Sequence, residues 1–141
     1  MSDEYTSNLE YVEAIVAILV RYLFTSDEDD DEYKRNIIID TGVFRHVAPQ
    51  DAVRILRKQL DITNIGELDP ADIAAFADVL PHRLREKTFA LIVNAATYED
   101  DAAPGTELYD VFGRAAVLLD VPRELAEKIV DVARVLERRI E

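Results

Sequence analysis

Apolar residues recur at steps of three and four along most of this chain, and this spacing restricts its fold more than any other feature. One face of an α-helix repeats about every 3.6 residues, so each such run predicts a helix with one apolar side. The first run covers residues 7 to 24. Further runs begin near Pro49, Pro70, Leu84, Thr106 and Pro122. The sequence therefore predicts an all-α fold of about seven helices.

The segment from residue 33 to residue 45 fits two kinds of structure. Its apolar residues allow a second helix that ends near Phe44. The three consecutive isoleucines Ile37, Ile38 and Ile39 also suit a strand, because β-branched side chains are favoured there. A helix and a strand both stay open for this segment.

Several of the expected helices have a start signal or an inner face that can be assigned. In the fourth helix, Asp69 is expected to be the cap and Pro70 the first helical residue, with the end near Pro81. The inner face of the third helix is predicted to carry Val53, Leu56 and Leu60. The last helix is predicted to face the core with Leu125, Ile129, Val132, Leu136 and Ile140.

The two halves of the chain share a pattern. Ala17 corresponds to Ala90, Asp27 to Asp100 and Pro49 to Pro122, each pair 73 residues apart. Each half then reads as helix, acidic stretch, helix, proline, helix, and the helix after Pro70 connects the halves. This pattern predicts two similar three-helix units that cover one another's apolar sides. Chance similarity between amphipathic helices is the alternative.

Length and composition favour a single domain over residues 1–141. The chain has 141 residues, of which 49% are hydrophobic, and this is enough to bury a sizeable core. There is no cysteine, so disulfides, thiolate metal sites and a cysteine nucleophile are excluded. The start "MSDEYTSNLE" has neither the basic flank nor the apolar run of a signal peptide, so a cytoplasmic location is expected. The run from Ala14 to Phe24 is too short and too charged to span a bilayer.

The net charge of −13 argues against two classes of partner. Nucleic acids and anionic membranes require clustered lysine and arginine, so no nucleic acid and no direct membrane insertion are expected. Cation binding, a basic protein partner and simple solubility remain. Solubility is the default interpretation of an acidic surface.

Two acidic stretches, "TSDEDDDE" at 25 to 32 and "YEDDAAPGTE" at 98 to 107, follow expected helix ends. In the first stretch, Asp31 and Glu32 precede the next expected helix, where negative charge is favoured. In the second, Glu99, Asp100 and Asp101 follow a helix end, where negative charge is unfavourable unless a cation or a basic group is near. Carboxylates are the ligands that hard cations prefer, so the predicted metal site holds Ca²⁺ or Mg²⁺ between Asp27, Asp29, Asp100 and Glu107. Solvated loops are the alternative, with Thr106 and Glu107 serving only to begin a helix.

An EF-hand does not fit the first stretch. Counted from Asp27, position six is Glu32 where glycine is required, and position twelve is Ile38 where a bidentate glutamate is required.

Nothing in the sequence forms a known catalytic motif. There is no Ser-His-Asp order, phosphate loop, HExxH or glycine-rich motif, so no enzymatic activity is expected. His46 and His82 each lie beside an arginine and are expected at the surface or at a helix start.

A helix, an acidic loop and a second helix, followed by "LLDVPRELAEKI", resembles the TerB-like family associated with bacterial tellurite resistance. In this resemblance Asp100 stands for the loop aspartate, and Glu107 follows it by seven residues. The sequence departs from the family pattern at Asp101, where a glycine is usual, and at Lys34, where a glutamate is usual in the first half. The resemblance extends from about Leu9 to Leu136.

What the resemblance implies is an all-helical fold with pseudo-twofold halves in a bacterial cytosol. It also implies a non-enzymatic role in the stress response, through divalent cations and membrane-linked partners. The alternative function is an acidic helical module that binds a basic protein partner without metal. A homodimer through the amphipathic last helix is a further alternative.

If Asp100 and Glu107 hold a divalent cation, adding Ca²⁺ or Mg²⁺ should stabilise the folded protein. The gain is about 2.7 kcal/mol when the ion is at 100 times its Kd, because the ion binds the native state in preference to the unfolded chain. Thermal melting at constant ionic strength measures it. Asp100→Asn should abolish the gain; identical shifts in wild type and variant would reduce the acidic stretch to solvation and capping.

Overall fold

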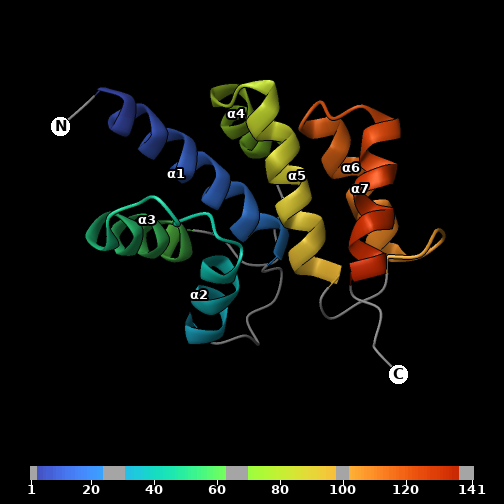
Figure 1. The fold of residues 1–141 in the computed structure, drawn as a ribbon, viewed down its shortest axis with the longest axis horizontal. Helices are drawn as coiled ribbons and strands as arrows, with labels where there is room; N and C mark the ends of the chain where they lie inside the picture. Colours follow the sequence, from blue (N-terminus) through green and yellow to red (C-terminus); the bar gives the residue numbers. More distant parts are fainter. Residues whose placement is uncertain (1–2, 24–30, 63–69, 98–101, 137–141) are drawn as a thin grey trace. The chain divides into compact units, whose positions relative to one another are not determined.

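The computed structural model describes residues 3–23, 31–62, 70–97 and 102–136 and contains helices but no strand in these ranges. The all-α fold of about seven helices is therefore confirmed (Figure 1). The helices are α1 (Asp3–Leu23), α2 (Asp31–Asp40), α3 (Pro49–Ile62), α4 (Pro70–Val79), α5 (His82–Thr97), α6 (Glu107–Leu118) and α7 (Arg123–Leu136). They form two compact units, Met1–Leu80 and Pro81–Glu141.

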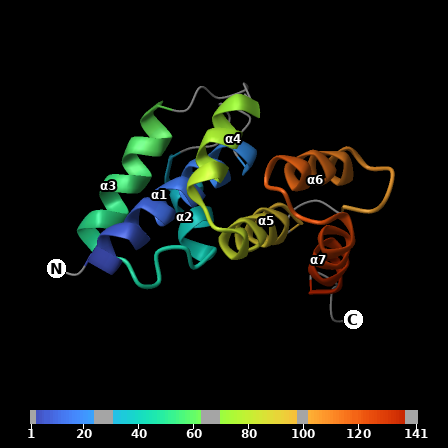
Figure 2. The same ribbon diagram turned by 90° about the horizontal axis from the view of Figure 1, so that it is seen from above.

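In the first unit α1 is the central helix and contacts α2, α3 and α4. Figure 2 shows α1 passing between α3 and α4. All seven residues from Ala14 to Val20 are buried, so this part of α1 is covered on every side. A helix that is apolar all round is expected in a core, and the run that the sequence marked as apolar has this position.

Arg21 joins three helices of the first unit at the end of this buried stretch. Its Nη1 donates to the carbonyl of Ala17 at 2.9 Å and to Oε1 of Gln59 in α3 at 3.3 Å. Its guanidinium carbon lies 4.8 Å from the ring centroid of Phe76 in α4. This distance is within the range of a cation–π interaction, so Arg21 holds α3 and α4 against α1.

The inner face of α3 differs from the prediction. Ile55, Leu56 and Gln59 are buried, whereas Val53 is 56% exposed. Gln59 shares the buried face with Leu56, because its side chain accepts the hydrogen bond from Arg21. The prediction for Val53 was wrong, since apolar spacing alone does not show that a polar residue shares the buried face.

The segment of three isoleucines forms helix α2, so the strand alternative was wrong. Ile38 is buried and Ile39 is exposed. The helix ends at Asp40 and not near residue 45, because Gly42 adopts φ +81° and its N–H donates to the carbonyl of Ile39 at 3.0 Å. Glycine adopts this left-handed conformation without steric cost and commonly follows a helix end.

Helix α4 begins at Pro70, as the sequence predicted, while Asp69 lies outside the described residues. It belongs to the first unit, where it contacts α1, and it lies between α3 and α5 along the chain. The order of elements in the two halves does agree with the predicted repeat: Pro49 opens α3, and Pro122 directly precedes α7. Superposition of the halves and one domain over residues 1–141 stay predictions.

In the second unit α5 contacts both α6 and α7, and α6 contacts α7. Phe89 of α5 meets Phe112 of α6 in an edge-to-face contact, with ring centroids 6.4 Å apart and ring planes at 77°. The buried hydroxyls of Thr88 and Thr97 donate to the carbonyls of Leu84 and Val93, at 2.6 and 2.8 Å. These bonds satisfy polar groups that would otherwise destabilise the core.

Helix α7 turns a different face to the core from the one predicted. Ala126, Val130 and Ala133 are buried, whereas Val132 is 58% exposed and Leu136 is 69% exposed. Leu125 and Ile129 are half-buried, and Ile140 lies outside the described residues. Helix α7 contacts both α5 and α6, and its buried face carries the two small alanine side chains. The predicted inner positions of Val132 and Leu136 were wrong.

No helix within the described ranges combines the length and the hydropathy needed to cross a lipid bilayer.

Two valines on α7 test its orientation. Val130→Ala should destabilise the protein by about 2 kcal/mol, because it removes two buried methyl groups. Val132→Ala removes the same atoms from an exposed position, where alanine is the better helix former, so the free energy of unfolding should change by less than about 0.5 kcal/mol. Chemical denaturation measures both, and equal losses in the two variants would contradict the orientation.

Candidate functional site

The structure describes one of the four predicted metal ligands. Glu107 is the first residue of α6 and is exposed, whereas Asp27, Asp29 and Asp100 lie outside the described residues. Among the residues that are described, no group of three or more histidine, aspartate and glutamate side chains is arranged to hold a metal ion. The Ca²⁺ or Mg²⁺ site therefore stays a prediction.

Thr106 has the capping role that the sequence suggested. Its φ and ψ are −83° and 157°, and its hydroxyl accepts a hydrogen bond from the N–H of Tyr109 at 3.2 Å. Glu107 lies in the first turn, where a negative charge is favoured by the helix dipole. The local role of these two residues in starting α6 requires no cation.

The two histidines are both exposed, as expected. His46 lies in the turn after α2, and His82 is the first residue of α5. Nε2 of His82 is 3.6 Å from Oδ2 of Asp120, and both side chains are largely exposed. Such a surface pair contributes little to stability.

A groove with a volume of about 360 Å³ lies between α6 and α7 in the second unit. Cavities of this size hold ligands in many proteins. Helix α6 lines it with Tyr109, Phe112, Gly113, Ala116 and Val117. Helix α7 lines it with Arg123, Ala126, Glu127 and Val130. The set is completed by Phe89 and Val121.

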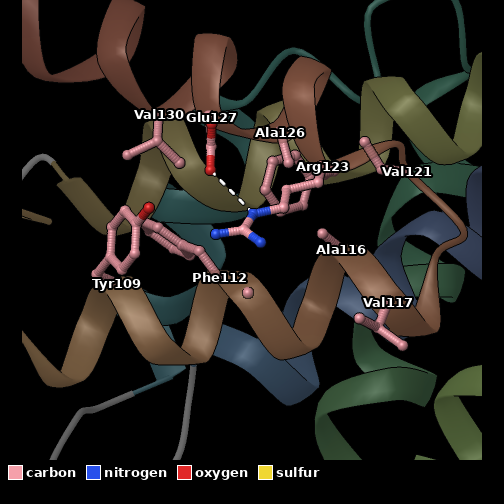
Figure 3. A pocket seen from close by; sticks show the side chains of 11 residues that line it. Tyr109, Phe112, Ala116, Val117, Val121, Arg123, Ala126, Glu127 and Val130 are labelled. Atoms are coloured by element: carbon pink, nitrogen blue, oxygen red, sulfur yellow. Dashed lines mark hydrogen bonds and ion pairs between the residues drawn. The ribbon is translucent and has the colours of Figure 1, made fainter. Parts of the chain in front are cut away.

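The lining residues lie along one stripe of each helix. On both helices they follow steps of three and four, so each set occupies a single face. The stripe from Tyr109 to Val117 is about 12 Å long at 1.5 Å per residue. In Figure 3 Tyr109 and Val130 lie at one end of the groove, and Val117 and Val121 lie at the other.

Small residues make the groove deep. Phe89 and Phe112 are buried, and they line the groove together with the small residues Ala116 and Ala126. At Gly113 an added Cβ would meet no atom within 4 Å, so the missing side chain leaves open space. Val117 at the rim is 79% exposed and gives the groove an apolar wall that faces solvent.

The connection from α6 to α7 closes one end of the groove. The N–H of Val121 donates to the carbonyl of Ala116 at 2.8 Å, and the N–H of Asp120 donates to that of Val117 at 3.1 Å. This pair of bonds is the Schellman pattern of helix termination, in which the residue after the helix takes a left-handed conformation. Here that residue is Asp120, with φ 55°. Aspartate is among the few residues besides glycine that adopt this conformation readily.

An ion pair lies at the mouth of the groove. Nε of Arg123 is 3.1 Å from Oε1 of Glu127, one turn along α7, and the Arg123 side chain is 91% exposed. Figure 3 shows the guanidinium group over the space between the two helices. The groove therefore combines an apolar floor with one positive and one negative side chain at its rim.

The sequence predicted α6 and α7 but not the groove between them. Gly113 in the interior of a helix and Val117 on its outer face are the signals that could have indicated it. Glycine there costs helix stability, so its presence suggests that space or close approach is needed.

Comparisons of the chain with protein-family models, with curated proteins and with solved structures found no match. The resemblance to the TerB-like family therefore stays a prediction from the sequence.

Gly113→Ala should stabilise the protein by about 0.5–1 kcal/mol, because alanine is the better helix former and its methyl group enters open space. Thermal or chemical denaturation measures the change. A loss of stability would show that the added methyl group clashes with other atoms and that there is no open space at Gly113.

Proposed function

We propose that this chain is a non-enzymatic helical interaction module, and that the α6–α7 groove binds an amphipathic helix of a basic partner protein. The open apolar groove between two exposed helical stripes is the observation that supports this proposal. Its length of about 12 Å matches the span of helix side chains at positions i, i+3 or i+4, and i+7.

The groove walls favour a helix as the bound element. The backbone N–H and C=O groups within α6 and α7 are used inside those helices, so the walls offer no free edge to an extended peptide. A bound segment must satisfy its own backbone groups once it leaves water. A helix does so internally and presents only side chains to the apolar floor.

The charge of the protein favours a basic partner. Residues 1–80 carry seventeen acidic and seven basic residues, and residues 81–141 carry twelve and nine. The total of −13 attracts a basic partner over a distance comparable with the Debye length and accelerates its association. The apolar contacts in the groove then provide most of the affinity.

A designed probe tests the function. The probe is a fluorescent, blocked helical peptide of about 14 residues, with leucines at i, i+4 and i+7 and lysines on its other faces. Fluorescence anisotropy should show saturable binding to the wild-type chain. Gly113→Leu should weaken binding by at least about tenfold, equivalent to 1.4 kcal/mol, because the new side chain fills the groove.

Val132→Leu is the matched control, since it enlarges an exposed apolar residue of α7 that does not line the groove. Circular dichroism verifies that both variants keep their helices. Equal affinity of wild type and Gly113→Leu for the peptide would contradict docking in the groove.

A further inference from the structure

Arg123 occupies a position that local helix energetics disfavour. It is the first residue of α7, where the helix dipole favours negative charge, as at its neighbour Glu124. Its partner Glu127 follows it by four residues, and the reverse order, with the acid first, is the more stabilising one. The start of the helix does not favour an arginine, and the exposed ion pair with Glu127 stabilises it only weakly.

Two charged residues line the groove, and both belong to α7. Arg123 is the positive group nearest the closed end, and its guanidinium reaches over the floor (Figure 3). Glu127 lies one turn further along α7. A bound helix therefore meets a positive charge at Arg123 and a negative charge one turn further along α7.

We propose that Arg123 recognises a carboxylate side chain on the bound partner helix, and that Glu127 then pairs with a basic side chain one turn away on that helix. This inference rests on the proposed function. On docking, the exposed Arg123–Glu127 ion pair within α7 is replaced by two ion pairs between the protein and the partner helix. The planar guanidinium, with five N–H donors, is suited to a carboxylate because it can donate two parallel hydrogen bonds.

The recognised feature is thus more specific than a positive net charge on the partner. The whole protein is acidic and repels an acidic segment, so a carboxylate is tolerated only where it reaches Arg123. The predicted partner is a basic helix with an apolar stripe and a single acid beside one end of that stripe. A free anionic amphiphile would share the carboxylate and the apolar chain but would lack the second, basic contact to Glu127.

The experiment uses the leucine peptide in four versions, with one glutamate moved through the positions of a single helical turn, and a glutamine counterpart of each. Binding to the full chain is measured at about 20 mM salt, where screening of exposed pairs is weak. In one register the wild type should prefer glutamate over glutamine by roughly two- to fivefold, the range for an exposed ion pair. Arg123→Gln should abolish this preference and leave the glutamine peptide bound.

Arg114→Gln is the matched control, since Arg114 is an exposed arginine of α6 that does not line the groove, and it should keep the preference. A preference that survives in Arg123→Gln, or none in any register, overturns the assignment. If the peptides bind and Gly113→Leu blocks them without a glutamate preference, only the role of Arg123 fails. Loss of all groove-dependent binding would contradict the proposed function and this inference together.

Discussion

The contact of Phe89 with Phe112 is the interaction on which the second unit and its groove depend. The two buried rings meet edge to face at 6.4 Å and hold α6 on α5. Buried aromatic pairs of this geometry contribute more than their area alone. Helix α7 contributes Ala126, Val130 and Ala133 to the buried residues of this unit. The two rings are also among the residues that line the groove between α6 and α7.

Much of the fold could be predicted because its signals are local. Pro49, Pro70 and Pro122 mark the helix starts, and the hydroxyl of Thr106 caps α6 through a bond to a residue three positions away. The inner faces were harder. In α3, Val53 fits the apolar spacing but is exposed, and Gln59 lies on the buried face. In α7, Val132 is likewise exposed, and Ala126 lies on the buried face. A buried glutamine bonded to Arg21 and the burial of two alanines are tertiary effects, which spacing within one helix does not contain.

The same limit applies to the candidate site. Acidic stretches are visible in the sequence, so they suggested the cation ligands, of which Glu107 is exposed at the start of α6. The groove arises from side chains of three helices and from the turn at Asp120, so no single stretch reveals it. Its function would follow from a division of roles: negative charge attracts the partner, the apolar floor holds a helix, and Arg123 selects among helices.

The most direct measurement is of intermolecular nuclear Overhauser effects between the leucine methyl groups of the bound peptide and the side chains of the protein. We expect contacts to the methyl groups of Ala116 and Ala126 and to the ring of Phe112, which line the groove. Val132, Val135 and Leu136 form the other exposed apolar surface in the described part of α7. Contacts confined to these three residues would contradict docking between α6 and α7.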